Sequence, residues 1–376
     1  MSHNILHLHS SFNLGGKEAR AVQLMNHFGS AARHTIVSGV ADQLSAREAI
    51  APGIRYEIAQ DPPPLAGRPS VARYEALARY MRRFDLVLTY NWGAIDAVMA
   101  KRVFRHGVPP LIHHEDGFNA DEANRLKPER NLYRRLALAA AHALVVPSQT
   151  LEAVALNIWR QPRERVHRIA NGIDIARYTA PPAADAIPGF RRKKDEVVIG
   201  TLAGLRAVKD LPLLVRAVGG IAENVQLVIV GEGPERAQIA QAAAAMGLGK
   251  RLHMPGFLPD PHRYIGLFDI FALSSWSEQF PISVVEAMAA GLPVVAPLVG
   301  DVAAMVSPAN RPCLAGHRGE VWLRDALAAM VQDKALRMRV GAENRTQAAQ
   351  LYDEKPMFSA YAGLYGAAMG HADAFG

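Results

Sequence analysis

Short apolar runs alternate with helical patterns along almost the whole chain, and this alternation constrains the fold more than any other feature. The runs DLVLTY (residues 85–90) and VQLVIV (residues 225–230) have the length and β-branched content of buried strands. Amphipathic stretches such as residues 17–28 lie between such runs. Alternation of this kind predicts parallel sheets with helices on both faces, which is the α/β class.

The alternation stops once, at residues 179–196, where prolines, alanines and a charge cluster replace any periodicity, and then it starts again. We therefore expect two doubly wound domains, at residues 1–180 and 197–350, with a linker at residues 181–196. A helical tail at residues 351–376 is expected to return to the first domain. The length of 376 residues agrees with two domains. Ligands of such sheets bind at the carboxyl ends of the strands, so we expect the chemistry in a cleft between the domains.

The composition excludes several classes of protein. Apolar residues make up 50% of the chain and charged residues 20%, which excludes disorder over most of its length. The single cysteine, Cys313, excludes a disulfide framework and a multi-cysteine metal site, and it favours the reducing cytoplasm. No window carries about 18 consecutive apolar residues, and the start of the chain lacks the layout of a signal peptide. We expect a cytoplasmic protein that is soluble or attached to a membrane only at its surface.

The positive charge is concentrated in the first half of the chain. Residues 1–190 hold 23 lysines and arginines against 17 aspartates and glutamates, whereas residues 191–376 hold 19 against 18. Basic helical stretches lie at residues 79–83 and 130–135. Such a half can contact an anionic membrane surface, or it can be an ordinary solvated surface, and both interpretations stay open. No nucleic-acid motif is present, so no nucleic-acid partner is expected.

The most informative segment is residues 274–296, SSWSEQFPISVVEAMAAGLPVVA. A predicted strand ends in a loop that carries Glu278, Pro281 suits the first turn of a helix, and Glu286 lies about one and a half turns inside that helix. A helix N-terminus suits a phosphate, and ionised carboxylates accept hydrogen bonds from sugar hydroxyls. Glu286 interrupts an apolar run, and an unpaired buried carboxylate is costly. These features favour a binding role over a solvated surface helix.

This segment resembles the E-x7-E region of the retaining glycosyltransferases of family 4, which have the GT-B fold and take a sugar from a nucleotide donor. Four further segments resemble motifs of this family in the same order, namely residues 13–19 (NLGGKEA), 169–174 (IANGID), 200–209 (GTLAGLRAVK) and 230–234 (VGEGP). Gln279 is a departure, because the family usually has glycine there. The resemblance implies two Rossmann-like domains that face a central cleft, and metal-independent transfer with retention of the anomeric configuration.

The resemblance also implies roles for particular residues. Arg206 and Lys209 would stabilise the leaving diphosphate, because cations placed beside developing negative charge lower the barrier. Glu278 would contact the donor sugar and Glu286 the ribose of the nucleotide. The further donor-binding candidates are Gly15 and Gly16 at the start of the first helix, Gly256, Phe257 and Leu258 near the base, and Phe280, Pro281 and Ile282 beside Glu278.

Two neighbouring histidines, His113 and His114, follow a predicted strand in the region where the family has a histidine that contacts the transferred sugar. Alternation sends their side chains to opposite faces of the sheet, so which of them faces the cleft stays open. His7 and His9 are more consistent with structural or cleft-lining roles than with metal binding. No Asp-x-Asp pair occurs in the chain, and we expect neither a metal nor another cofactor.

We therefore predict a hexosyltransferase-type glycosyltransferase that moves sugar from a UDP- or GDP-sugar to a glycan, glycolipid or lipid acceptor. Synthesis of bacterial surface polysaccharide, lipopolysaccharide or glycolipid is the expected setting, at the inner face of the membrane. Backbone contacts to the base leave UDP, GDP and ADP open. One alternative is a nucleotide-sugar 2-epimerase-like isomerase, which would form product from the donor alone. The other is a non-catalytic nucleotide- or glycan-binding protein, which would be expected to lack Glu278, Arg206 or Lys209.

Overall fold

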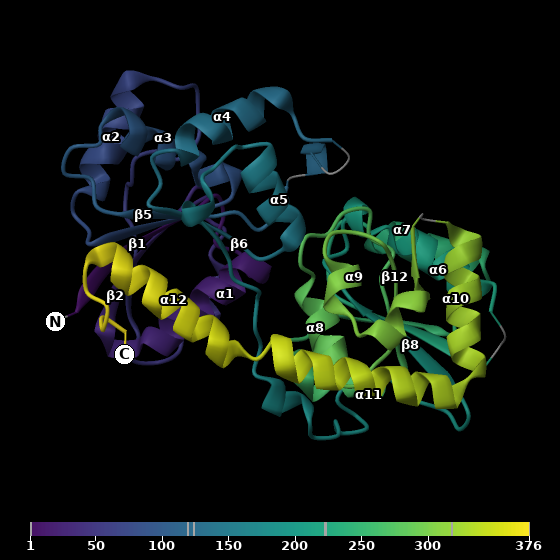
Figure 1. The fold of residues 1–376 in the computed structure, drawn as a ribbon. Coiled ribbons are helices and arrows are strands. Elements are labelled where there is room, and N and C mark those ends of the chain that lie inside the picture. Colours follow the sequence, from purple (N-terminus) through teal and green to yellow (C-terminus); the bar gives the residue numbers. More distant parts are fainter. Residues whose placement is uncertain (1, 119, 123–124, 222–223, 317–318, 376) are drawn as a thin grey trace. The chain divides into compact units, whose positions relative to one another are not determined.

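The protein consists of two compact units in a computed structural model that describes residues 2–118, 120–122, 125–221, 224–316 and 319–375 (Figure 1). The N-terminal unit comprises Met1–Asn171 and Lys355–Gly376, and the C-terminal unit comprises Gly172–Glu354. Each unit contains one parallel sheet. The predicted α/β class with two doubly wound sheets is confirmed.

The division between the units lies at Asn171, earlier than the segment 181–196 that the composition indicated. Burial gives the physical reason. Tyr178, Ile187 and Phe190 are at most 8% exposed, so this proline-rich stretch packs as part of the C-terminal unit although it has little periodicity. The proline and charge content indicated that this stretch lacks regular structure. It did not indicate where the chain passes from one unit to the other.

The sheet of the N-terminal unit has seven strands among the described residues, in the order β3-β2-β1-β4-β5-β6-β7. The neighbouring strands pair in parallel. The strands are β1 (His3–His9), β2 (Ala32–Ser38), β3 (Arg55–Ile58), β4 (Leu86–Tyr90), β5 (Leu111–His114), β6 (Ala143–Val146) and β7 (Val166–Arg168). Every residue of β4, β5 and β6 is buried, as in a sheet that helices cover on both faces.

Helices cover both faces of this sheet. The helices of the N-terminal unit are α1 (Gly16–Phe28), α2 (Val71–Met81), α3 (Ile95–Val103), α4 (Pro128–Leu138), α5 (Gln149–Asn157) and most of α12 (Glu354–Met369). Side chains of α2, α3, α4 and α5 form the core on one face. Side chains of α1 and α12 form the core on the other face, although α12 lies near the end of the chain (Figure 1). The unit is therefore closed by a segment far away in sequence.

The sheet of the C-terminal unit has six strands among the described residues, in the order β10-β9-β8-β11-β12-β13. The strands are β8 (Val197–Leu202), β9 (Val225–Val230), β10 (Leu252–Gly256), β11 (Ile270–Ala272), β12 (Val294–Pro297) and β13 (Leu314–Ala315). The helices are α6 (Leu211–Gly219), α7 (Arg236–Ala245), α8 (Ile282–Ala289), α9 (Val302–Met305), α10 (Glu320–Gln332) and α11 (Lys334–Leu351). Strands β8 and β11 are neighbours, so the loops that follow them meet at one edge of the sheet.

The periodicity missed two strands and misidentified one helix. Strand β3 is a short, mostly exposed edge strand, and β13 has two residues, so neither gives a hydrophobic pattern. The apolar spacing of residues 261–268 is that of a helix, but these residues form two 3₁₀ turns, Pro261–Arg263 and Ile265–Leu267. Tyr264 separates the turns with φ −141°, which no helix permits.

Candidate active site

Two loops at the carboxyl edge of the C-terminal sheet bring Lys209 and Glu278 together. Lys209 ends a 3₁₀ turn after β8, and Glu278 lies in the loop after β11. Lys209 Nζ donates to Glu278 Oε1 at 2.5 Å, and the two side chains are 17% and 11% exposed. Ser274 Oγ also donates to the carbonyl of Lys209 at 2.8 Å. The loops are therefore tied by side-chain and backbone contacts, and the ion pair is largely shielded from water.

Arg206 has a different environment from Lys209. It lies at the start of the same 3₁₀ turn, is exposed, and forms no ion pair with any residue that the structure describes. A carboxylate therefore already neutralises one of the two predicted diphosphate-binding cations, whereas the other is free. An anionic ligand at this edge would meet the guanidinium of Arg206 without first displacing a partner.

The loop that carries Glu278 accommodates Gln279, the residue that departs from the family pattern. Gln279 is not among the described residues with a positive φ, so a non-glycine residue fits here without backbone strain. Its carbonyl accepts a hydrogen bond from the Asp301 amide at 3.0 Å. Gly300 has a φ of +52°, and a side chain there would meet the carbonyls of Glu278 and Gln279. Gly300 thus permits the close approach that supports this loop.

The residues after Gln279 lead into α8. Phe280 packs its ring edge-on against Tyr352, with ring centroids 5.5 Å apart, so its side chain anchors the loop. Pro281 is buried at the N-cap of α8, and Ile282 is the first residue of this helix. The first turn of α8 therefore follows Glu278 closely in the sequence. The free backbone N–H groups of such a first turn suit a phosphate.

Glu286 lies on α8 beside two buried tyrosines. Tyr178 Oη donates to Glu286 Oε1 at 3.2 Å. Burial raises the pKa of Glu286 to about 7, and the hydrogen bond from Tyr178 opposes this shift. Burial, followed by the charge of Glu286, raises the pKa of Tyr264. The sequence did not identify Tyr178 and Tyr264 as neighbours of Glu286, because both are far from Glu286 along the chain.

The candidate loop for the nucleotide base follows β10. Gly256 has a φ of +94°, and its carbonyl accepts a hydrogen bond from the Gly231 amide at 2.9 Å. Phe257 is 59% exposed, and the carbonyl of Leu258 accepts a hydrogen bond from Tyr264 Oη at 3.1 Å. The turn at Gly256 therefore needs glycine, and the position of Leu258 is fixed by a buried tyrosine.

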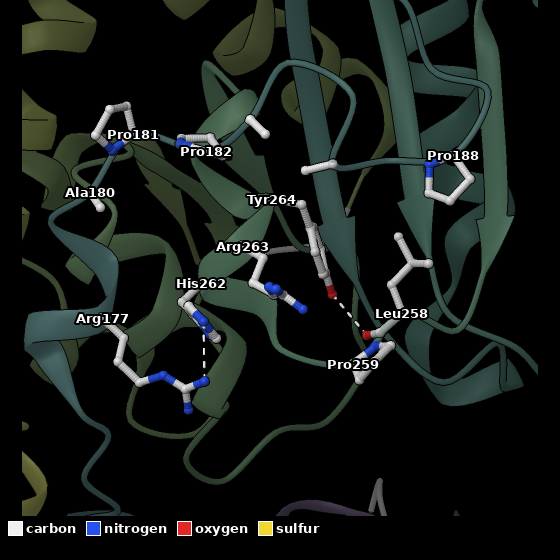
Figure 2. A pocket seen from close by; sticks show the side chains of 12 residues that line it. Arg177, Ala180, Pro181, Pro182, Pro188, Leu258, Pro259, His262, Arg263 and Tyr264 are labelled. Atoms are coloured by element: carbon white, nitrogen blue, oxygen red, sulfur yellow. Dashed lines mark hydrogen bonds between the residues drawn. The ribbon is translucent and has the colours of Figure 1, made fainter.

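A pocket of about 520 Å³ opens beside this loop, within the C-terminal unit (Figure 2). Leu258, His262, Arg263 and Tyr264 line one part of it, and Arg177 with prolines and alanines of residues 180–188 lines the rest. The volume is in the usual range for small-molecule sites. No pattern in the sequence indicated this pocket, because part of its wall comes from the proline-rich stretch that was predicted to be a linker.

The histidine pair in the N-terminal unit has two different environments. Both rings are fully buried at the end of β5. His114 Nε2 accepts a hydrogen bond from Tyr365 Oη at 2.8 Å, and its Nδ1 lies 3.3 Å from the carbonyl of Thr89. Burial lowers the pKa of His114, so the ring is neutral and both nitrogens hold the fold together. His114 therefore ties β5 to α12.

His113 keeps one ring nitrogen free. Its Nδ1 pairs with Thr89 Oγ1 at 2.8 Å, whereas its Nε2 has no hydrogen-bond partner among the described residues. The nearest carboxylate is Glu115, whose Oε2 lies 3.7 Å from this nitrogen, and Arg134 Nε lies 3.4 Å from the same oxygen. The sequence did not identify Glu115 or Arg134 as neighbours of His113.

Gly15 and Gly16 lie at the start of α1 in the N-terminal unit, Gly15 as the N-cap. A side chain at Gly15 would lie 3.0 Å from Glu18 Oε2, so glycine leaves room for this buried carboxylate. Arg20, on the same helix, forms a two-pronged ion pair with Asp116 and donates to Asn171 Oδ1 at 2.9 Å. The Asn of the IANGID motif therefore belongs to a buried network, which the sequence did not reveal.

His7 and His9 are fully buried on β1. His7 pairs with His34 at 2.9 Å and with Tyr90 Oη at 3.2 Å. His9 stacks on Tyr90, with ring centroids 4.0 Å apart, and neither of its ring nitrogens has a hydrogen-bond partner among the described residues. Over the described part of the chain, no three histidine, cysteine, aspartate or glutamate residues are grouped as metal ligands.

The basic stretch at residues 130–135 is less exposed than its composition indicated, whereas Arg79, Arg82 and Arg83 of the stretch at residues 79–83 are exposed. Arg134 is fully buried and makes two hydrogen bonds of 3.0 Å to Glu122. Arg130 pairs with Glu122 and Asp121. Arg135 remains exposed on α4, next to the exposed Leu132 and Leu136. In the described part of the chain, no helix is long and apolar enough to cross a bilayer.

Two family profiles match the chain, one on each side of the division between the units. The profile described as Glycosyltransferase Family 4 matches residues 14–177, and the profile described as Glycosyl transferases group 1 matches residues 185–347. The chain belongs to the family 4 glycosyltransferases. The family predicted from the E-x7-E segment is therefore confirmed.

Relatives of this family 4 chain come from several bacteria. The putative glycosyltransferase EpsF of Bacillus subtilis is 31% identical over 201 residues, which cover 50% of this chain and 51% of EpsF, so the match spans about half of that relative. A D-inositol 3-phosphate glycosyltransferase of Corynebacterium efficiens is 26% identical over 307 residues, 72% of this chain and 71% of the relative. The lipopolysaccharide core biosynthesis glycosyltransferase LpsD of Rhizobium meliloti is 27% identical over 195 residues, 51% of this chain and 56% of LpsD.

Solved structures of glycosyltransferases share the fold. HepE of Anabaena, solved with UDP and glucose, has a TM-score of 0.75 and 20% identity, and the match covers 96% of this chain and 98% of HepE. WaaG, described as a glycosyltransferase involved in lipopolysaccharide biosynthesis, has a TM-score of 0.69 and 16% identity over 99% of both chains. The predicted GT-B fold of two Rossmann-like domains is confirmed for this family 4 chain.

Proposed function

We propose that this protein transfers a hexose from a nucleotide-sugar to a glycan, glycolipid or lipid acceptor, with retention of the anomeric configuration. The observation that carries the proposal is the cluster at the carboxyl edge of the C-terminal sheet. The unpaired Arg206 lies three residues from Lys209, which is held by Glu278, and α8 begins just after that glutamate. Cations, a helix N-terminus and a carboxylate at one strand edge suit a sugar diphosphate.

The proposed reaction is a front-face displacement. The bond between the anomeric carbon and the diphosphate oxygen breaks while the acceptor oxygen bonds to the same face of that carbon. The acceptor hydroxyl gives its proton to a donor phosphate oxygen, and Arg206 with Lys209 stabilises the negative charge on the departing diphosphate. Glu278 accepts hydrogen bonds from the sugar hydroxyls and Glu286 from the ribose. The proposed mechanism uses neither a metal nor a covalent intermediate.

His113 is the candidate for the histidine that contacts the transferred sugar. The proposal rests on the free Nε2 of His113 and on the two fold contacts of the His114 ring. Gly15 and Gly16 are proposed to lie near the donor phosphates, because glycines at a helix start leave backbone N–H groups accessible.

Surface glycan or glycolipid synthesis is the proposed setting. EpsF and LpsD support it, because LpsD is named for lipopolysaccharide core biosynthesis and both are named glycosyltransferases.

We also propose contact with an anionic membrane through the exposed Arg135, Leu132 and Leu136 of α4. Co-sedimentation with phosphatidylglycerol vesicles at low salt tests this contact. Wild-type protein should pellet and Arg135→Glu protein should pellet less, whereas equal pelleting with neutral vesicles would contradict it.

The central proposal is tested by nuclear magnetic resonance with UDP-glucose, GDP-mannose and ADP-glucose as donors and either water or a lipopolysaccharide core oligosaccharide as acceptor. We expect one donor to be consumed, with the nucleoside diphosphate and an α-configured sugar product as the first products. An added chelator should not slow the reaction. A β-configured first product would contradict retention, and formation of a 2-epimer from donor alone would favour the isomerase.

A further inference from the structure

Asn91, at the end of β4, has a backbone conformation that glycine adopts and other residues rarely do. Its φ is +55° and its ψ is −174°. Asp210 and Asp260 also have a positive φ, but their ψ values of +46° and +65° place them in the left-handed helical region, where aspartate and asparagine are tolerated. Asn91 lies outside that region. Backbone strain of this kind persists where the surrounding structure imposes it, and it is most frequent at functional sites.

Two hydrogen bonds to the end of β5 hold Asn91 in this conformation. Its amide donates to the carbonyl of His114 at 2.8 Å, and its Oδ1 accepts from the Asp116 amide at 2.7 Å. Because a backbone amide can only donate, the side-chain atom that faces it is Oδ1, and Nδ2 points away. Nδ2 donates to no residue that the structure describes, and the side chain is only partly buried. The strained backbone therefore presents accessible N–H groups in a fixed direction.

Asn91 lies where the N-terminal sheet changes its strand order. Strand β1 lies between β2 and β4, so the chain builds the sheet outward from β1 on one side and from β4 on the other. Doubly wound sheets bind their ligands outside the carboxyl ends of the strands at such a point. A side chain at Gly93 would lie 2.2 Å from Ser10 Cβ, so the loops after β1 and β4 touch. The strained residue thus lies where a sheet of this type binds a ligand.

The carboxylate of Asp116 adds hydrogen-bond acceptors beside Asn91. Arg20 donates to both of its oxygens, and this ion pair fixes the carboxylate. Each oxygen keeps a lone pair, and the side chain is 12% exposed. A sugar carries several hydroxyls that both accept and donate, so it can serve the Asn91 donor and the Asp116 acceptor. A phosphate would instead face a carboxylate, and an apolar ligand would leave both groups without hydrogen bonds.

We propose that Asn91 and Asp116 form a sugar-binding site at the carboxyl edge of the N-terminal sheet, in which Asn91 Nδ2 donates to a sugar hydroxyl. The proposal rests on the proposed glycosyltransferase function and deepens it. The sugar belongs either to the donor or to the acceptor, because both present the same hydroxyl chemistry. The strained backbone fixes the direction of the amide before the sugar arrives, which reduces the entropy lost on binding.

Calorimetry with the three nucleotide-sugars, and an array of bacterial surface oligosaccharides, test the proposal on the full chain. Asn91→Asp keeps the oxygen that accepts from the Asp116 amide and removes the Nδ2 donor, whereas Asn91→Gly removes the side chain and the strain. Both variants should bind either the nucleotide-sugar or an oligosaccharide about 3- to 10-fold more weakly, the scale of one hydrogen bond. UDP, GDP and ADP without a sugar should bind as in wild-type protein. A loss for the nucleotide-sugar assigns the site to the donor, and a loss for the oligosaccharide assigns it to the acceptor.

Arg160→Gly is the matched control, because Arg160 also has a positive φ, +52°, and is exposed in the loop before β7. This variant should bind every ligand as wild-type protein does. Melting temperatures test the strain itself. Asn91→Gly should melt above Asn91→Ala, since glycine adopts this backbone without strain.

The outcomes separate the sugar site from the function. Unchanged binding of nucleotide-sugar in Asn91→Asp and Asn91→Gly, together with unchanged or absent binding of oligosaccharides, would overturn the site and leave the proposed function standing. An equal loss for nucleotides with and without a sugar would also overturn it, because Asn91 would then act on the fold and not on the sugar. Absence of nucleotide binding in wild-type protein would contradict the proposed function, on which the site depends.

Discussion

Lys209 Nζ lies 2.5 Å from Glu278 Oε1, although the two residues are 69 positions apart in the sequence. The pair joins the loops that follow the adjacent strands β8 and β11. Arg206, by contrast, has no ion-pair partner among the described residues. The two predicted diphosphate-binding cations therefore differ, because only Lys209 also holds the site together. This difference separates the expected behaviour of their variants.

Arg206→Ala should slow sugar transfer by about 100-fold or more, the scale seen when one preorganised charge donor is removed. The melting temperature should not change, because Arg206 is exposed and unpaired within the described chain. Steady-state turnover and differential scanning fluorimetry measure the two quantities. Arg339→Ala, exposed on α11, serves as the control with normal values for both. Near-normal turnover in Arg206→Ala would remove Arg206 from the proposed site.

Lys209→Ala should lower both turnover and stability, because it leaves Glu278 as a largely buried carboxylate without its partner. We expect a loss of about 1–3 kcal/mol in the free energy of unfolding. Adding Glu278→Gln should restore most of the stability and none of the turnover. Chemical denaturation of the two single variants and the double variant gives the coupling energy. Additive losses of stability would mean that the ion pair does not support the fold.

Nucleotide binding should depend on pH through Glu286, whose pKa burial raises to about 7. In the proposed function the ionised carboxylate accepts hydrogen bonds from the ribose, so the affinity should be full well above pH 7 and fall towards tenfold per pH unit below it. Glu286→Gln should weaken UDP at pH 8 and flatten this dependence. Tyr178→Phe removes the hydrogen bond that opposes the shift, so the midpoint should move to higher pH. Calorimetry at pH 5.5–8.5 measures both, and an unchanged pH profile in Glu286→Gln would refute the role.

Acid should destabilise the protein through its buried histidines. Burial lowers the pKa of His7, His9 and His114 below the unfolded value of about 6.5, so below that pH the unfolded chain binds more protons than the folded one. The contribution of these neutral histidines to the free energy of unfolding is fully present above about pH 6.5. It is lost as the pH falls, by up to about 1.4 kcal/mol per pH unit for each histidine. His9→Phe, which keeps the stacking on Tyr90, should reduce this slope by up to one proton. Chemical denaturation at pH 5.5–7.5 measures how the free energy of unfolding changes with pH. Equal slopes for wild-type protein and His9→Phe would contradict a contribution of His9.

The two neighbouring histidines should respond differently to substitution. His114→Phe loses the hydrogen bonds to Tyr365 and Thr89, so it should lower the melting temperature, as Tyr365→Phe should to a smaller extent. His113→Asn should lower turnover by more than its effect on stability explains. Comparing kcat with melting temperature across the three variants separates the roles. A larger loss of turnover in His114→Phe, at temperatures where all variants are folded, would reverse the proposed roles.

Local sequence determined the elements that depend on short-range pattern. The buried strands β4 and β9 were predictable because β-branched runs of this length fit the interior of a parallel sheet. The pair Glu278 and Glu286 was identifiable because loop, proline and helix follow one another within a few residues. Strand β3 and the turns around Tyr264 gave no such signal, because an exposed edge strand and 3₁₀ turns have no hydrophobic period.

Contacts between distant residues were decided only by the tertiary structure. The ion pair of Lys209 with Glu278, the hydrogen bond of Tyr178 to Glu286 and the bond of His114 to Tyr365 join positions 69, 108 and 251 residues apart. The sequence alone determined that these residue types were present at strand ends and on helices. Which of them meet depends on how strands are ordered in a sheet and which helix covers each face, and burial then sets their pKa values. A linear pattern carries the local backbone preferences, whereas partners and desolvation exist only once the chain has packed.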